Sequence, residues 1–132
     1  MTYYVSRTIN GPYEAAVTAV REALASEGFG VITEIDIART MITKLGLAFR
    51  PYVILGACNP ALAHEALLLE DKVGTMLPCN VIVQDIGADR FEVAAIDPVA
   101  SMAAIDNPAL KVAAAVVADK LRAAIARLPS AE

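Results

Sequence analysis

Hydrophobic and polar positions along the chain follow two periods, one of two residues and one of between three and four. Alternating positions predict five strands, over residues 3–9, 29–36, 49–58, 81–86 and 91–96. Helical spacing predicts four helices, over residues 13–27, 37–45, 60–70 and 108–128. The predicted order is therefore strand, helix, strand, short helix, strand, helix, hairpin and helix.

Capping residues and turn residues mark the ends of these elements. Asn59–Pro60, Asp97–Pro98 and Asn107–Pro108 each combine a side chain that can cap a helix with a proline at the first helical position. Asp36 is expected to cap the short helix, and Gly46 to end it. The segment from Gly87 to Arg90 separates two alternating stretches, which is typical of a hairpin turn.

The pattern favours an α+β fold, with helices packed on one face of a mostly antiparallel sheet. Strands do not alternate strictly with long helices, as they would in a doubly covered parallel sheet. Glu34 and Asp36 also place polar side chains on one face of their strand, so we expect that face to meet water. A chain of 132 residues is most simply one domain, spanning residues 1–132.

Composition and charge disfavour several classes of function. Hydrophobic residues make up 57% of the chain, yet no apolar run reaches the roughly 18 residues that cross a membrane. The chain enters its first strand without a leader pattern, so we expect a cytoplasmic protein with reduced thiols. The net charge is −4 and the basic residues are scattered, which disfavours nucleic acid as a partner. Because so apolar a chain can present surface that one domain leaves uncovered, we expect a homodimer.

The candidate site is centred on Cys58, directly before the expected N-cap Asn59. Free backbone N–H groups and the positive end of the helix dipole favour the thiolate form of a cysteine at such a position. They also attract anions, so the expected ligand is small and either anionic or electrophilic. In the alternative interpretation, Cys58 is a small apolar residue of the core.

Cys79 and Asn80 join this site only if the sheet is antiparallel there. The end of strand 49–58 and the start of strand 81–86 would then lie side by side, with Cys79 next to Cys58. If the two strands were parallel, the thiols would be a strand length apart, roughly 17–20 Å. Taken alone, Cys79 is typical of a structural cysteine.

His64, the only histidine, lies near the start of the predicted helix 60–70. With Cys58 and Cys79 it would give a three-ligand set with an open position, as in catalytic zinc sites. The spacing matches no standard zinc signature, and a surface histidine is the simpler interpretation.

Three segments, ILGACNPALAHEAL, VGTMLPCNVIV and FEVAAIDP, resemble the bacterial and archaeal domain of unknown function 302. The resemblance covers nearly the whole chain. It implies a β-α-β4-α core whose antiparallel sheet is similar to half of the TATA-box-binding-protein fold, with short helices inserted. It also implies that Asn59 and Pro60 mark a shared turn, whereas Cys58 and Cys79 belong to a subgroup.

These observations favour a small homodimeric module that binds a ligand beside Cys58, Asn59, Cys79 and Asn80. A thiol redox protein or enzyme, with Cys58 as nucleophile and Cys79 as resolving thiol, is one alternative. A metal-binding protein that uses both cysteines and His64 is another, and a scaffold without a site is a fourth interpretation. The sequence leaves the cofactor, the substrate and any catalysed reaction open.

Overall fold

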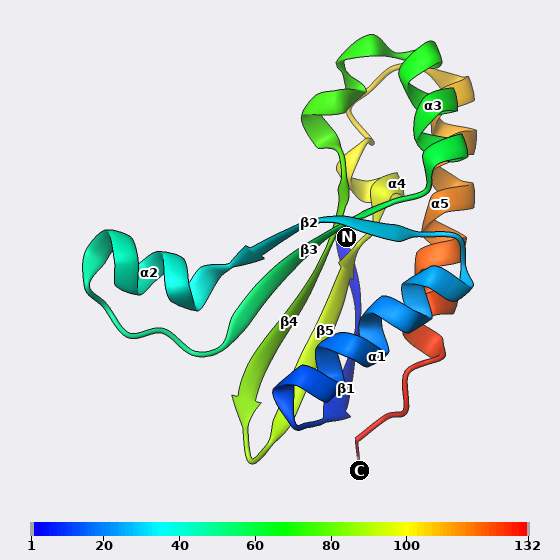
Figure 1. The fold of residues 1–132 in the computed structure, drawn as a ribbon. Helices are drawn as coiled ribbons and strands as arrows, with labels where there is room; N and C mark the ends of the chain where they lie inside the picture. Colours follow the sequence, from blue (N-terminus) through cyan, green and yellow to red (C-terminus); the bar gives the residue numbers. More distant parts are fainter. Residues whose placement is uncertain (1, 132) are drawn as a thin grey trace.

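The computed structural model describes residues 2–131 and contains a five-stranded antiparallel sheet (Figure 1). Its strands are β1 (Tyr4–Asn10), β2 (Gly30–Asp36), β3 (Tyr52–Cys58), β4 (Cys79–Gly87) and β5 (Arg90–Ile96). Their order across the sheet is β1-β5-β4-β3-β2, and every neighbouring pair is antiparallel. The predicted α+β class is confirmed.

Two long helices, α1 (Tyr13–Ser26) and α5 (Pro108–Ala126), pack against each other and against the sheet (Figure 1). The shorter helices are α2 (Ile37–Leu45), α3 (Pro60–Leu69), the 3₁₀ helix η1 (Asp71–Met76) and α4 (Pro98–Ser101). The strands with α1 and α5 form the expected β-α-β4-α core, and the shorter helices are insertions in it. Within residues 2–131, every helix is too short or too polar to cross a membrane.

The predicted helix caps are present as hydrogen bonds. Asp36 accepts the N–H of Arg39 at 2.9 Å, and Asn107 accepts the N–H of Leu110 at 3.1 Å. Gly46 ends α2 in the left-handed conformation, with φ of 66°, which glycine adopts without a steric penalty. Local side-chain chemistry therefore sets where these helices begin and end.

Three details differ from the sequence predictions. The third strand starts at Tyr52, because the residues from Gly46 to Pro51 form a loop. Residues 71–76 form η1, for which no element was expected. Strand β2 is exposed on both faces, because it lies at the sheet edge and its pairing shifts between Val31 and Thr33.

The helix-covered side of the sheet forms the main hydrophobic core. Its strand residues include Ile9, Leu55, Ala57, Cys79, Val81, Val83, Val93 and Ala95. Helices α1 and α5 contribute Ala16, Val20, Leu24, Leu121, Ala124 and Ile125. A second, smaller cluster lies around α3, α4 and the start of α5, and comprises Ala66, Val73, Met102, Leu110 and Ala114.

The opposite side of the sheet carries the alternate side chains of the five strands, and none of them is buried. This surface, called the open face below, comprises Tyr4, Ser6, Thr8, Thr33, Ile35, Tyr52, Ile54, Asn80, Ile82, Gln84, Glu92, Ala94 and Ile96.

Residues 37–51, called the arm below, consist of α2 and the loop that follows it. Figure 1 shows α2 and this loop projecting from the sheet, well away from α3 and α5. No residue of the arm is buried.

Candidate functional site

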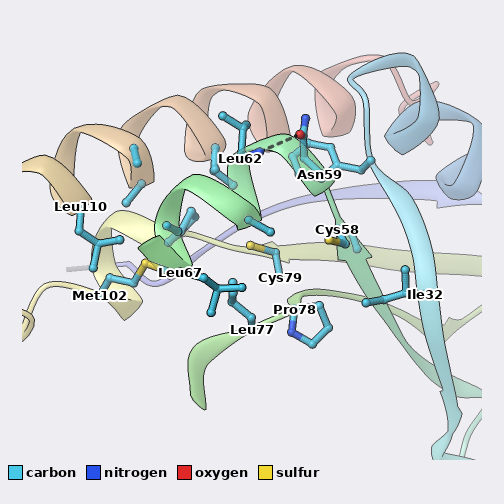
Figure 2. A pocket seen from close by; sticks show the side chains of 18 residues that line it. Ile32, Cys58, Asn59, Leu62, Leu67, Leu77, Pro78, Cys79, Met102 and Leu110 are labelled. Carbon is cyan, nitrogen blue, oxygen red and sulfur yellow. Dashed lines mark hydrogen bonds between the residues drawn. The ribbon is translucent and has the colours of Figure 1, made fainter. Parts of the chain in front are cut away.

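The sheet brings Cys58 and Cys79 together. Strands β3 and β4 pair antiparallel, with Ala57 directly opposite Cys79, so the condition for neighbouring thiols is met. Both cysteines are free, and both line one pocket (Figure 2).

This pocket has a volume of about 280 Å³ and lies between the ends of β3 and β4, α3, α4 and α5. Its lining comprises Phe29, Ile32, Ala57, Cys58, Asn59, Leu62, Ala63, Ala66, Leu67, Leu77, Pro78, Cys79, Pro98, Met102, Leu110, Ala113, Ala114 and Val117. Asn59 contributes the one amide side chain in this set, and no lining residue is charged. The surface offered to a ligand is therefore almost entirely apolar.

Small residues on the facing helices leave the space open. Helix α3 presents Ala63 and Ala66, and α5 presents Ala113 and Ala114. Protein interiors normally pack at the density of organic crystals. Leucines at these four positions would fill the volume in that way, whereas alanines leave it open. Helices α3 and α5 contact each other, and their short alanine side chains leave a cavity beside this contact.

Asn59 caps the start of α3 and lines the pocket. Its side-chain oxygen accepts the N–H of Leu62 at 3.2 Å (Figure 2). Its backbone oxygen accepts the N–H of Ala63 at 2.9 Å. Pro60 has no N–H to offer. Of the first four helical residues, only Ala61 keeps a free N–H, so little of the expected anion-attracting group remains.

The two thiols differ in their surroundings. Cys79 is 7% exposed, whereas Cys58 is half-buried at the strand end. Burial, with a smaller contribution from neighbouring Cys58, raises the pKa of Cys79 to about 11. Cys79 is therefore a protonated thiol at neutral pH and not an activated nucleophile.

Asn80 and His64 lie outside the pocket. Cys79 faces the helices, so the next residue along β4, Asn80, points to the open face. His64 is exposed on α3 and does not line the pocket. Among residues 2–131, no three His, Cys, Asp or Glu side chains gather closely enough to hold a metal ion, so His64 does not complete a set with Cys58 and Cys79.

Sequence reasoning missed the helical walls of the pocket. Leu110, Ala113, Ala114 and Val117 recur at helical spacing within helix 108–128 and form part of its apolar stripe, which the sequence does not assign to a site. Part of this stripe extends beyond the sheet and faces α3 instead. The apolar stripe extends through nearly the whole of α5, which is further than the sheet alone can cover. This length is the sequence signal that could have indicated a second apolar contact for α5.

The fold and pocket together define an α+β domain with a β-α-β4-α core and an apolar cavity under its inserted helices. The family model described as "Domain of unknown function DUF302" matches residues 5–128, so the chain belongs to this family.

One solved relative shares the whole architecture. The crystal structure of an uncharacterized conserved DUF302 protein from Bacillus stearothermophilus superposes with a TM-score of 0.89 at 28% sequence identity. The superposition covers 98% of this chain and 100% of that one. No curated protein matches the chain.

Proposed function

We propose that this protein binds a small, predominantly apolar molecule in the pocket between α3, α5 and the ends of β3 and β4. The observation that supports this function is the cavity of about 280 Å³ with an uncharged and nearly wholly apolar lining. Ligand sites are typically concave and apolar, with a few polar groups that orient the ligand. Here Asn59 and the two thiols are those groups.

The same lining favours a neutral ligand over the anionic one that the sequence suggested. No Lys or Arg lines the pocket, and the first N–H groups of α3 are largely bonded to Asn59. An anion entering this cavity would lose its hydration without gaining a charged partner, which is strongly unfavourable. An apolar group would gain contacts at little desolvation cost.

A matched pair of fluorescent probes tests this proposal. N-phenyl-1-naphthylamine is neutral, and 1-anilinonaphthalene-8-sulfonate has the same rings with a sulfonate added. We expect saturable binding of the neutral probe, one molecule per chain, and weaker binding of the sulfonate. Absence of saturable binding of the neutral probe, or tighter binding of the sulfonate, would overturn the proposal.

Two alanine substitutions on α5 localise the binding. Ala113→Leu places a larger side chain in the cavity and should weaken binding of the neutral probe at least about tenfold. Ala115→Leu, on the exposed side of the same helix, is the control and should leave the affinity unchanged. Thermal unfolding of both variants checks that they are folded. Equal affinities for the two folded variants would place the probe elsewhere and contradict the proposed site.

A second candidate function, thiol redox chemistry, has support from two free cysteines at one pocket. With hydrogen peroxide as oxidant, Cys58 and Cys79 would form one S–S bond, and the peroxide would be reduced to two water molecules that carry the two thiol protons. The buried, protonated state of Cys79 disfavours this function at neutral pH. Peroxide treatment of the native protein followed by intact mass measurement tests it. A loss of two hydrogens that disappears in Cys58→Ala would support it, and an unchanged mass would exclude it.

A further inference from the structure

We propose that Cys58 forms a covalent bond with neutral α,β-unsaturated carbonyl compounds that carry an apolar tail. The inference rests on the proposed function, because the tail must first bind in the pocket, and it adds the chemical class of the ligand and a reaction. It requires a free thiol where the pocket opens, an apolar interior for the tail and a second thiol that does not compete for the bond.

Burial increases along the pocket from one end to the other. Ile32, on the edge strand β2, is 63% exposed, and Cys58 is half-buried. Met102 is 6% exposed and Leu110 is 1% exposed. Figure 2 shows Ile32 and Cys58 at one end of the lining. Met102 and Leu110 lie at the other end, with Cys79 between the two groups (Figure 2). A ligand that enters beside Cys58 therefore places its far end among buried apolar side chains.

The sheet holds Cys58 at the open end of the pocket. Cys58 is the last residue of β3 and pairs with Gly30 of β2. The preceding residue, Ala57, pairs with Cys79 of β4, and the following residue, Asn59, caps α3. A reactive group on a strand between two neighbours is positioned more precisely than one on a loop. The thiol is free, so it is available at the place where a ligand enters.

Cys79 does not compete with Cys58 for the ligand. Its thiol lines the cavity and, within residues 2–131, is bonded to no other group. Burial, and to a smaller extent Cys58, raise the pKa of Cys79 to about 11, so it keeps its proton at neutral pH. The nucleophile is the thiolate, and a cysteine reacts readily with carbon electrophiles even when only a small part is ionised. Addition uses one sulfur and no oxidant, so the buried state of Cys79 opposes disulfide formation but not this reaction.

The lining of the pocket selects the class of ligand. Its residues are uncharged and nearly all apolar, so a charged electrophile would lose its hydration without gaining a partner. Each methylene group of a neutral tail is stabilised when it leaves water for this cavity. No lysine lines the pocket, so a bound carbonyl compound meets the Cys58 sulfur and not an amine that would form a Schiff base. Binding then holds the double bond beside the sulfur, and this proximity raises the rate of addition.

The addition balances with water as the only other reactant. The Cys58 thiol gives its proton to water, and its sulfur forms a C–S bond with the β-carbon of the ligand. The electron pair of the C=C π bond moves towards the carbonyl group as an enolate, whose α-carbon then takes one proton from water. The product is a thioether with a saturated carbonyl group. No oxidant or reductant is consumed, and the chain gains the whole mass of the ligand.

Two unsaturated aldehydes with the same reactive group test this inference. The aldehyde trans-2-nonenal carries a long alkyl tail, and crotonaldehyde carries a single methyl group. Intact mass measurement of the full chain should show one nonenal added, and fragmentation should place it on Cys58. Cys58→Ala should remove this addition, whereas Cys79→Ala should retain it. A Schiff base on a surface lysine adds the mass of the aldehyde less one water molecule, so it is distinguished from the thioether.

The rates with the two aldehydes show whether the pocket takes part. Relative to free cysteine, nonenal should react with Cys58 at least about tenfold faster than crotonaldehyde, because only its tail is long enough to fill the pocket. Ala113→Leu, which fills part of the cavity, should remove this preference. Ala115→Leu, on the exposed side of α5, is the control and should keep it.

Circular dichroism establishes that each variant is folded, and binding of N-phenyl-1-naphthylamine separates this inference from the proposed function. Saturable probe binding together with a tail-dependent addition at Cys58 would support the inference. Saturable probe binding without addition at Cys58 would overturn the inference and leave the proposed function in place. Equal normalised rates for the two aldehydes would also overturn it, because Cys58 would then react as an exposed thiol. Absence of saturable probe binding would overturn the proposed function itself, and the inference with it.

Discussion

The pocket and the arm both contain clustered apolar side chains, but the two regions differ in how far these side chains are exposed to solvent. Around the pocket, helices α3, α4 and α5 bury Met102, Leu110 and their neighbours and leave a cavity with an apolar lining. The arm leaves Leu45 and Leu47 facing outwards, with nothing from residues 2–131 over them. An enclosed apolar surface is suited to a small molecule, whereas a projecting one is suited to a protein surface.

The two regions should differ most in the free energy of unfolding that is lost when a leucine is replaced by alanine. Leu110→Ala should reduce the free energy of unfolding by about 2–5 kcal/mol, because the side chain is buried. Leu45→Ala should change it by no more than about 0.5 kcal/mol, because that side chain is already in water. Urea unfolding of both variants measures the difference. Comparable losses of unfolding free energy for the two variants would show that the arm packs on its own chain. That result would contradict the contrast between a buried pocket wall and an exposed arm.

The pH dependence of stability probes the interior of the pocket. The pKa of Cys79 is raised from 9.0 to about 11, so the folded protein keeps the thiol proton that the unfolded chain loses in this range. This stability is fully present below pH 9 and is lost as the pH rises towards 11, by about 2–3 kcal/mol. Cys79→Ala should remove this part of the pH dependence, whereas Cys58→Ala should keep most of it, because burial is the larger cause. Urea unfolding from pH 8 to 11 gives the difference from wild type, and identical profiles for wild type and Cys79→Ala would contradict it.

The smallest expected effects come from the two matched helix caps. Asp36 caps the arm helix α2 and Asn59 caps the pocket helix α3, so Asp36→Ala and Asn59→Ala should each cost about 1 kcal/mol locally. Amide hydrogen exchange should accelerate in α2 alone for the first variant and in α3 alone for the second. Weakened probe binding is expected only for Asn59→Ala, because Asn59 lines the pocket and Asp36 does not. Effects that cross between the regions would show that pocket and arm are coupled.

Much of the fold could be predicted from the sequence because its signals are local. The caps at Asp36, Asn59 and Asn107, and the strand alternation, each depend on residues close together in the chain. The nearness of Cys58 and Cys79 could be predicted only conditionally, since it depends on the direction of strand pairing.

The pocket walls and the arm surface could not be predicted in this way. The cavity is made by alanines on helices far apart in the chain, and alanine at helical spacing looks the same whether it faces a core or a cavity. Asn80 follows Cys79 directly, yet the alternation of a strand places it on the other face. The arm helix has an amphipathic pattern, and this pattern does not show that its own chain leaves the apolar side exposed.

Amide chemical-shift mapping of the wild-type protein with saturating N-phenyl-1-naphthylamine tests the central claim most directly. An apolar probe could settle on any apolar surface, so its position distinguishes the pocket from the arm and the open face. We predict shifts concentrated on α3, the first half of α5 and the strand ends at Cys58 and Cys79, with the arm unchanged. Shifts centred on the arm or the open face, with the pocket amides unmoved, would contradict the assignment of the pocket as the binding site.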